Sequence, residues 1–253
     1  MRPKSPSEIE AIRKSGQMLA AVLRHLESIL APGITGVEID RAARVKLSEL
    51  GGEPAFLGVP SGQRTPDFPS SVCISVNDAV VHGIPTDVPF KSGDLVSFDF
   101  GVKYKGMITD AARTFIVGGE PSDEKRQLVE QTKRSLDAGI KVIKHGARTG
   151  DIGAAVQTVL DEYGYGIVRE LVGHGVGHEL HEAPEIPNYG FKGMGDKLRE
   201  GMTIAVEPMA TLGDWHVVID PDGWTIRSRD GSLSAHFEDT LLVTKSGVEI
   251  LTR

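Results

Sequence analysis

Apolar positions near the N-terminal end follow a helical spacing in two consecutive segments. From Ile9 to Leu30 they recur every three or four residues, as on one face of an α-helix, and an Ala-Pro-Gly sequence at residues 31–33 ends the segment. A capping box at residues 7–10 (Ser-Glu-Ile-Glu) predicts the start of this helix. A second capping box at residues 35–38 (Thr-Gly-Val-Glu) predicts another helix that ends at Gly51-Gly52.

After these helices the pattern changes to short β-branched runs separated by turn residues. The runs predict strands over residues 72–76, 79–81, 95–102 and 107–117. Beyond Gly118-Gly119 the order repeats, with helices predicted over 122–144 and 149–163, the second capped by Thr149, and strands near 202–209, 216–219 and 236–243. We therefore expect a single α+β domain over residues 1–253, with two pseudo-symmetric halves, about 1–118 and 119–253, and a cleft where they meet.

Two aspartates lie in the hairpin predicted from strands 95–102 and 107–117. If the chain turns at Tyr104-Lys105, Asp99 and Asp110 pair directly across the hairpin. Cβ atoms paired in this way are about 4.5 to 5.5 Å apart, so the two carboxylates repel each other unless a cation lies between them. Apolar residues alternate with Asp99, which places it on a face that is either solvated or a site. Taken alone, the pair fits solvated acids as well as a metal site.

Segment 173–184 contains three histidines, His174, His178 and His181, among three glycines. Glycines disfavour a helix, so the segment is not the helical His-Glu-x-x-His zinc motif, and a loop or a bulged strand is predicted. A lone histidine is usually structural, but histidines clustered beside glycines favour a functional site.

Two more acids, Glu207 and Glu238, lie in segments predicted as apolar strands, where carboxylates are rarely buried without a partner. Together with His174 and the two aspartates, they form an oxygen-rich set able to hold two divalent ions. The alternative is four structural acids that are paired separately.

Composition limits the remaining choices. A net charge of −7 and a pI near 5.6 argue against general nucleic-acid binding. Cys73 is the only cysteine, which excludes an intrachain disulfide and a Cys-x-x-Cys pair. The first 14 residues lack the apolar core of a signal peptide, and no apolar run approaches the roughly 18 residues that span a membrane. We expect a cytoplasmic protein without membrane attachment.

Five short motifs together resemble the methionine aminopeptidase family, over the chain from about residue 7. They are Asp99 in Ser-Phe-Asp, Asp110 in Ile-Thr-Asp, His174 in Gly-His-Gly, Glu207 in Val-Glu-Pro and Glu238 in His-Phe-Glu. The resemblance implies the duplicated pita-bread fold, with a central antiparallel sheet covered by helices. It also implies two divalent ions (Co, Mn, Fe, Zn or Ni), with Asp99 on one, His174 and Glu207 on the other, and Asp110 and Glu238 bridging both.

The resemblance further implies a reaction and a substrate. A water held between the ions would attack the bond after the initiator methionine of peptides and nascent chains, with a small second residue preferred. Glu207 would move the proton, His181 would stabilise the carbonyl oxygen, and His82, in Val-His-Gly-Ile-Pro, would contact the substrate backbone. The methionine pocket would be lined by Phe68, Cys73 and Trp224. For Cys73 the alternative is a small buried hydrophobic residue.

Several features refine the resemblance. Residues 182–206 leave no room for the helical insertion of type II enzymes, so type I is expected. The chain carries extra residues around 59–69, including residues 63–67, and it has Leu180 where an aromatic residue is usual and His178 where the family usually has a basic residue. These departures bear on the shape of the pocket and on the preferred second residue. A monomer is expected, and any ribosome association would use the catalytic domain, because no zinc-binding extension precedes the first helix.

Two other functions remain open. A proline-specific aminopeptidase or prolidase on the same fold would share the five ligands but normally carries an additional N-terminal domain. A catalytically inactive peptide-binding protein of this fold typically lacks several ligands, whereas all five are present here.

Overall fold

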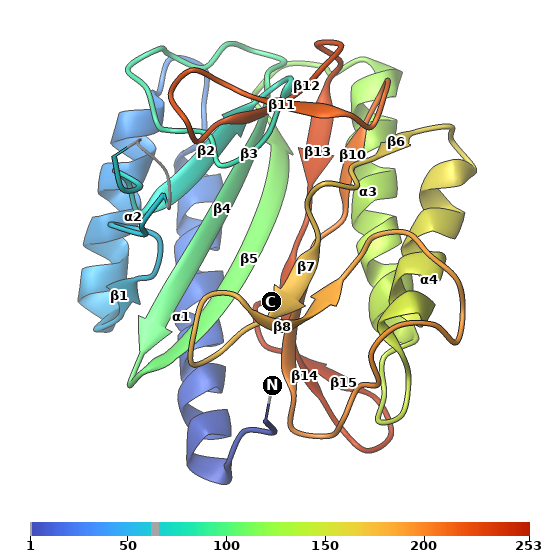
Figure 1. Ribbon diagram of the computed structural model, residues 1–253. Helices are drawn as coiled ribbons and strands as arrows, with labels where there is room; N and C mark the ends of the chain where they lie inside the picture. Colours follow the sequence, from blue (N-terminus) through green and yellow to red (C-terminus); the bar gives the residue numbers. More distant parts are fainter. Residues whose placement is uncertain (1, 62–65) are drawn as a thin grey trace.

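The computed structural model describes residues 2–61 and 66–253. Two pairs of helices flank the strands, with α1 and α2 on one side and α3 and α4 on the other (Figure 1). Their bounds are α1 Pro6–Ile29, α2 Gly36–Leu50, α3 Asp123–Lys141 and α4 Thr149–Asp161. The predicted order of two helices followed by strands therefore occurs twice. Of the extra residues noted in the sequence, Gly62 to Thr65 lie outside the described part of the chain.

Helix α1 begins two residues earlier than predicted. Ser5, rather than Ser7, is the N-cap: its hydroxyl accepts the N–H of Glu8 at 3.4 Å, and the Glu8 carboxylate accepts the N–H of Ser5 at 2.7 Å. Pro6 opens the helix, where its fixed φ and missing N–H are tolerated. The helix therefore begins with a capping box as predicted, but the box is formed by Ser5 and Glu8 instead of Ser7 and Glu10.

The other helix boundaries agree more closely with the sequence pattern. The predicted capping box of Thr35 and Glu38 begins α2, and Gly51 ends that helix in the left-handed conformation with φ 79°. At α4 the prediction is wrong by one residue, because Thr149 is the first helical residue and Arg148 is the N-cap.

All strand pairs are antiparallel within the described residues. The strands of the N-terminal half are β1 Glu53–Pro54, β2 Val72–Val76, β3 Ala79–Val81, β4 Leu95–Tyr104 and β5 Met107–Ile116. Those of the C-terminal half are β6 Gly166–Ile167, β7 Gly173–Gly175, β8 Glu182–Ile186, β9 Thr203–Val206, β10 Met209–Thr211, β11 Val217–Ile219, β12 Ile226–Ser228, β13 Ser234–His236, β14 Asp239–Val243 and β15 Val248–Ile250. One sheet has the order β1-β4-β2 with β5 also on β4, and another has the order β15-β14-β9-β7-β8. Two smaller sheets have the orders β13-β10-β6 and β11-β12-β3, the last of which joins strands of both halves.

The β4–β5 hairpin forms as predicted but in a different register. The chain turns at Lys105-Gly106, both with positive φ as in a type I′ turn, rather than one residue earlier. Asp99 therefore pairs with Ala112, and Asp110 pairs with Gly101, so the predicted direct pair of aspartates is wrong. A shift of two residues keeps side chains on the same face of the sheet, so the two acids remain diagonal neighbours.

Two segments predicted as continuous strands are each interrupted. Glu207 and Pro208 separate β9 from β10, and Phe237 and Glu238 separate β13 from β14. The last residue of β9 pairs with the first of β14, and the first residue of β10 pairs with the last of β13, so the two breaks face each other. Pro208 has no N–H for a ladder bond. The prediction that both glutamates stand within strands is therefore wrong, because both lie in the paired breaks.

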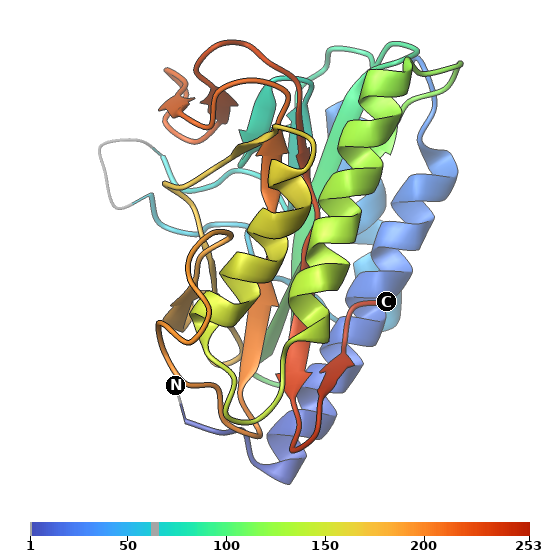
Figure 2. The same cartoon turned by 90° about the vertical axis from the view of Figure 1, so that its right-hand side faces the viewer.

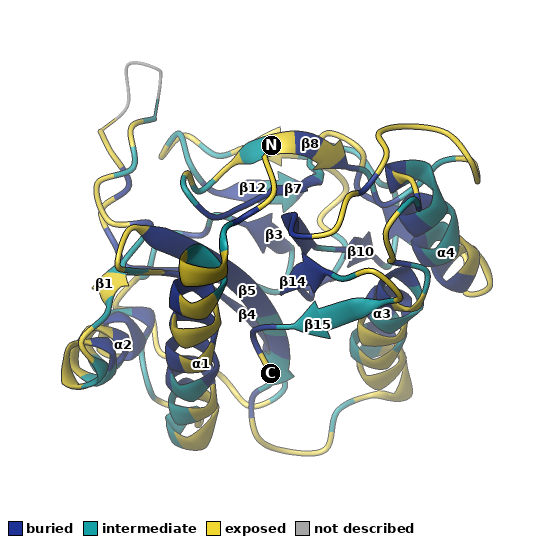
Figure 3. Ribbon diagram, turned by 90° about the horizontal axis from the view of Figure 1, so that it is seen from below, coloured by how far each residue is buried: buried dark blue, intermediate teal, exposed yellow. Residues whose placement is uncertain are grey.

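Two apolar clusters form the core. One packs α1 and α2 against β2, β4 and β5, with members between residues 18 and 117, and it includes the fully buried Phe98 and Phe100 of the predicted apolar face. Apart from Leu95, the buried members of the other lie between residues 128 and 243. Figure 3 shows the buried faces of the helices turned towards the strands. None of the helices in the described ranges is long and apolar enough to cross a membrane.

Figure 2 shows how the two faces of the molecule differ. Helix α1 lies on one side of the strands, and the N-terminal segment and β8 lie on the opposite side. The second face carries the loops that surround the candidate site.

Candidate metal centre

A cavity of about 520 Å³ lies where strands of the two halves meet. Its lining contains every residue that the sequence analysis assigned to a site. The predicted metal ligands there are Asp99, Asp110, His174, Glu207 and Glu238, and the other predicted site residues are Phe68, Cys73, His82, His181 and Trp224. Residues from widely separated parts of the chain are thus brought together, while their individual roles stay predictions.

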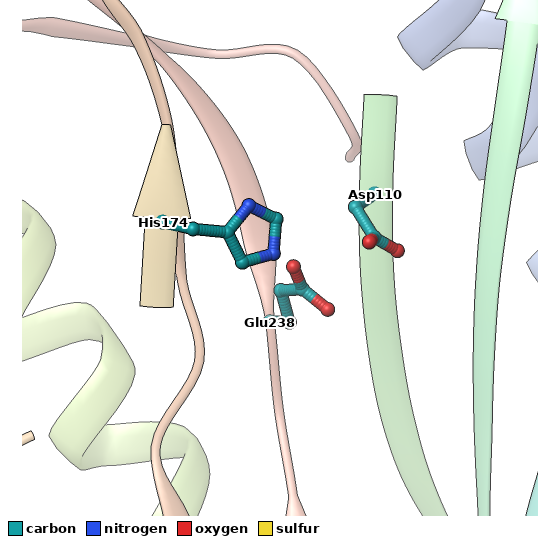
Figure 4. A group of neighbouring side chains, drawn as sticks. All are labelled: Asp110, His174 and Glu238. Carbon is teal, nitrogen blue, oxygen red and sulfur yellow. The ribbon is translucent and has the colours of Figure 1, made fainter. Parts of the chain in front are cut away.

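Three ligand atoms lie close together in this cavity. Asp110 on β5, His174 on β7 and Glu238 between β13 and β14 each offer one atom, and these atoms lie within 4.8 Å of one another (Figure 4). Nε2 of His174 is also 3.3 Å from Oε1 of Glu207. An ion with bonds of about 2.1 Å could reach all three atoms after side-chain shifts of less than about 1 Å, so the group can accommodate a divalent cation.

Thr240 and Glu238 of the C-terminal half hold the part of β5 that carries Asp110. The Thr240 hydroxyl accepts the N–H of Asp110 at 2.8 Å and donates to its carbonyl at 2.7 Å. Glu238 and Ala112 bond each other through their backbones, at 3.0 and 3.3 Å. Strand β5 is therefore joined to the break that contains Glu238.

His174 occupies the bulged strand that the glycine-rich sequence predicted. The ladder shifts between His174 and Gly175, and a Cβ on Gly173 would come within 2.4 Å of the Ala205 carbonyl oxygen. The carbonyl of Gly175 can only accept, so Nδ1–H of His174 donates to it at 2.9 Å. The Nε2 lone pair is consequently free to face the carboxylates.

The carboxylates carry unpaired oxygens away from bulk water. Oδ1 of Asp99, Oδ1 of Asp110 and Oε1 of Glu238 have no hydrogen-bond partner within the described ranges. Burial, and then repulsion by neighbouring acids, raises the pKa of Asp99, Glu207 and Glu238 well above the ordinary range. Burial raises the pKa of Asp110 to about 7. Such a cluster favours protonation or a bound cation, and its oxygen-rich donors with one imidazole fit hard or borderline divalent ions.

Histidines surround the acids in the neutral form. Burial lowers the pKa of His82 to about 4 and of His174 to about 3. His82 has a left-handed backbone with φ 57°, and a Cβ on the following Gly83 would lie 2.1 Å from the Ile74 carbonyl oxygen. This close approach fixes the turn that carries His82. His181 is accessible from the cavity. Its ring lies edge-on to that of His174, with 4.4 Å between the two ring centroids. Desolvation by the surrounding protein lowers the pKa of His181.

One histidine beside the site was missed in the sequence analysis. His236 is 1% exposed, neither of its ring nitrogens has a partner within the described part of the chain, and Nε2 lies 3.8 Å from Oε2 of Glu207. Burial lowers its pKa to about 3. Its place in the His-Phe-Glu motif, two residues before Glu238, was the available signal.

One wall of the cavity is apolar. Phe56, Phe68 and Cys73 form a buried cluster against which Leu180 and Trp224 pack. The rings of Phe68 and Trp224 meet edge to face with centroids 5.2 Å apart. Burial, followed by the charge of nearby acids, raises the pKa of Cys73, so its neutral thiol is both a small buried hydrophobic residue and part of the lining.

Comparisons with known proteins agree with this geometry. The model of metallopeptidase family M24 matches residues 10–245. The chain is 42% identical over 249 residues to a methionine aminopeptidase of Clostridium perfringens, covering 98% of this chain and 97% of that protein. A crystal structure of methionine aminopeptidase from Thermotoga maritima has a TM-score of 0.95 and 45% identity, covering 100% of this chain and 99% of the other. The prolidase from Pyrococcus furiosus has a TM-score of 0.78 and 25% identity, covering 99% of this chain and 65% of the other.

Proposed function

The chain belongs to metallopeptidase family M24, and we propose that it removes the N-terminal methionine from peptides and newly made polypeptides. One observation carries the proposal. Carboxylates and one imidazole from both halves converge in a cavity whose other wall is apolar and contains a thiol. The relatives with higher identity are named methionine aminopeptidases, and this favours methionine over an Xaa-Pro substrate.

Two divalent ions would be held by the five predicted ligands. Asp99 would bind one ion, His174 and Glu207 the other, and Asp110 with Glu238 would contact both. The unpaired oxygens of Asp99, Asp110 and Glu238 support this assignment, because each is buried and needs a partner that no described side chain provides. Nε2 of His174 supports it as well, because its lone pair is available and lies 3.3 Å from Oε1 of Glu207. When bound, such ions lower the pKa of a water molecule towards neutrality and polarise a substrate carbonyl.

The surrounding side chains would perform the remaining chemistry. Glu207, which lines the cavity, would accept a proton from the attacking water and deliver it to the leaving amine. His181 would donate a hydrogen bond to the carbonyl oxygen as negative charge develops there. His82, which is neutral near pH 7, would hydrogen-bond to the substrate backbone.

The apolar wall would select the side chain of the first residue. Phe56, Phe68 and Trp224 offer aromatic surface, and a thioether packs well against rings and beside the Cys73 thiol. The free amino group of the substrate would face Asp99, which restricts cleavage to the first bond. Leu180 lines the cavity and is smaller than an aromatic residue, and we propose that the second substrate residue is nevertheless small.

The proposal is tested by removing and restoring metal. The chelated protein should be inactive and should release methionine from Met-Ala-Ser once a single divalent metal is returned, while a peptide that begins with Xaa-Pro should remain intact. Asp110→Asn should lower kcat/KM by roughly 100-fold or more, since even partners that support metal ligands account for about 10- to 100-fold. The control is Asp123→Asn, because that side chain is 88% exposed. Cleavage of the Xaa-Pro peptide alone would contradict the assigned substrate.

A further inference from the structure

The N-terminal segment crosses to the face of the molecule that carries the cavity. Residues that precede α1 lie beside β8 in Figures 1 and 3. The backbone N–H of Lys4 donates to the carbonyl of Gly201 at 2.8 Å, which anchors this segment to the C-terminal half. The segment therefore lies close to the turn that leads from β7 to β8.

Lys4 is the most deeply buried cation in this region. Its side chain is 0% exposed, and Nζ donates to both carboxylate oxygens of Glu182, at 3.2 and 3.1 Å. A Cβ on Gly177 would come within 2.4 Å of Cε of Lys4, so the lysine chain lies directly against the backbone of the turn. A buried ammonium is retained only where it is well paired, and Glu182 provides that pairing.

The Glu182 carboxylate also accepts hydrogen bonds from the backbone of the turn. Its Oε1 accepts the N–H of His178 at 2.6 Å and the N–H of Glu179 at 3.2 Å. Burial alone would raise the pKa of Glu182, but the hydrogen bonds from Glu179, Lys4 and His178 outweigh it and lower the pKa. The Glu182 carboxylate is therefore hydrogen-bonded both to the N-terminal segment, through Lys4, and to the backbone of the turn.

His178 forms a second link between the same two segments. Its Nε2–H donates to Oε1 of Glu8 at 2.8 Å, so Nδ1 is free to accept from Nζ of Lys4 at 3.2 Å. Arg2 donates to the same Glu8 carboxylate, with Nη1 at 2.9 Å from Oε2. The turn is thus held at two of its residues by side chains that lie more than 160 positions away in sequence.

His181 is the next residue before Glu182, and both line the cavity. We propose that Lys4 is a positioning residue: through Glu182 and His178 it fixes the turn of residues 177–182, and so fixes the imidazole of His181 at the cavity. This inference rests on the proposed function, in which His181 assists the reaction. Lys4 itself does not line the cavity, and it acts only through the turn.

The variant that tests this is Lys4→Met, which keeps the length of the side chain and removes its charge. Displacing a group at the reacting centre by about 1 Å can reduce the rate about 100-fold, so we expect kcat to fall by roughly 10- to 100-fold with KM changed much less. His174 precedes the turn, so metal affinity measured by calorimetry should stay within about threefold of the parent protein. The imidazole resonances of His181 in an isotope-labelled protein should shift, and residues 177–182 should become more sensitive to proteolysis.

Further variants separate positioning from general stability. Lys4→Arg should restore much of kcat, because a cation again meets Glu182. Glu182→Gln should repeat the loss, and combining it with Lys4→Met should add little, since both changes break one link. Arg13→Gln, which removes an exposed ion pair between α1 and Glu249 of β15, should leave kcat unchanged.

Two results would overturn the inference. One is a folded Lys4→Met protein with kcat within twofold of the parent. The other is a reduced kcat with unchanged His181 resonances. If Lys4→Met is too unstable to purify, Glu182→Gln gives the same two readouts. Failure of the parent protein itself to release methionine would contradict the proposed function instead, so the two failures are distinguishable.

Discussion

Asp110 is one of the acids whose protonation should control metal binding near neutral pH. Its pKa is raised by burial to about 7, so in the metal-free protein it is protonated below that pH. A metal ligand must lose its proton, so binding should release protons, and affinity should weaken as pH falls below 7, by about tenfold per pH unit for each proton displaced. His174, with a pKa of about 3, is already neutral and contributes nothing to this dependence between pH 5 and 7.

Calorimetry in two buffers of different ionisation enthalpy measures the protons released. At pH 6 we expect a release of about one proton or more per protein, which should diminish at pH 8. In Asp110→Asn the release at pH 6 should become smaller. An affinity independent of pH between 5.5 and 7.5 would show that the acids are not protonated in the metal-free state.

Much of the candidate site could be predicted at the residue scale, because its chemistry depends on which residues occur in which motif. Asp99 and Asp110 were placed on the same face correctly, since the two-residue periodicity of a strand does not depend on the register. Their exact pairing depended on one turn residue, Gly106, whose positive φ moved the turn. His236 was missed because its burial beside Glu207 depends on tertiary packing, and the His-Phe-Glu motif was the only local signal.

At the scale of elements, β5 and β14 are joined by the hydroxyl of one side chain. Thr240 satisfies both the backbone N–H and the carbonyl of Asp110. Thr240→Val keeps the shape and leaves both groups buried without a partner, which should lower the free energy of unfolding by about 1 to 3 kcal/mol. Urea unfolding measures this loss, and metal affinity should fall as well because Asp110 is no longer fixed.

The matched control is Thr158→Val, an exposed threonine whose hydroxyl bonds only within α4. It should change the free energy of unfolding by less than about 0.5 kcal/mol. Equal losses in the two variants would mean that the link between β5 and β14 contributes nothing specific.

Helices and strands were predicted well where periodicity and capping residues agreed, and poorly where tertiary pairing decided the outcome. The sequence predicts the capping box at Ser7, whereas the structure has it at Ser5, because both serines stand three residues before a glutamate. The breaks at Glu207 and Glu238 lie in apolar runs that read as unbroken strands. Only Pro208 indicated an interruption, and nothing local to Glu238 did, because its break is imposed by the strand it faces.

At the scale of the whole molecule, we propose that residues 1–118 and 119–253 are two halves of one domain. The two core clusters support this proposal, since each belongs almost entirely to one half. An ionic network joins the halves. Arg113 of β5 donates to Asp239 at 2.6 Å and to the Glu238 carbonyl, and Arg253 donates to Asp239 at 2.7 Å.

Asp239→Asn tests how much this network stabilises the protein. Asp239 is 0% exposed, and its loss of charge leaves two guanidinium groups without their shared carboxylate, so the free energy of unfolding should fall by about 3 kcal/mol or more. Glu249→Gln, which breaks an exposed ion pair, should lower it by less than about 1 kcal/mol. Similar urea midpoints for both variants would contradict a special role for the network.

The proposed ligands are divided between the halves: Asp99 and Asp110 belong to one, and His174, Glu207 and Glu238 to the other. An ion that contacts ligands of both halves links them. Because it binds the folded protein, it raises the free energy of unfolding by an amount that increases with the metal concentration. The supply of metal in a cell would then govern how long each copy of the protein survives degradation, in addition to how fast it works.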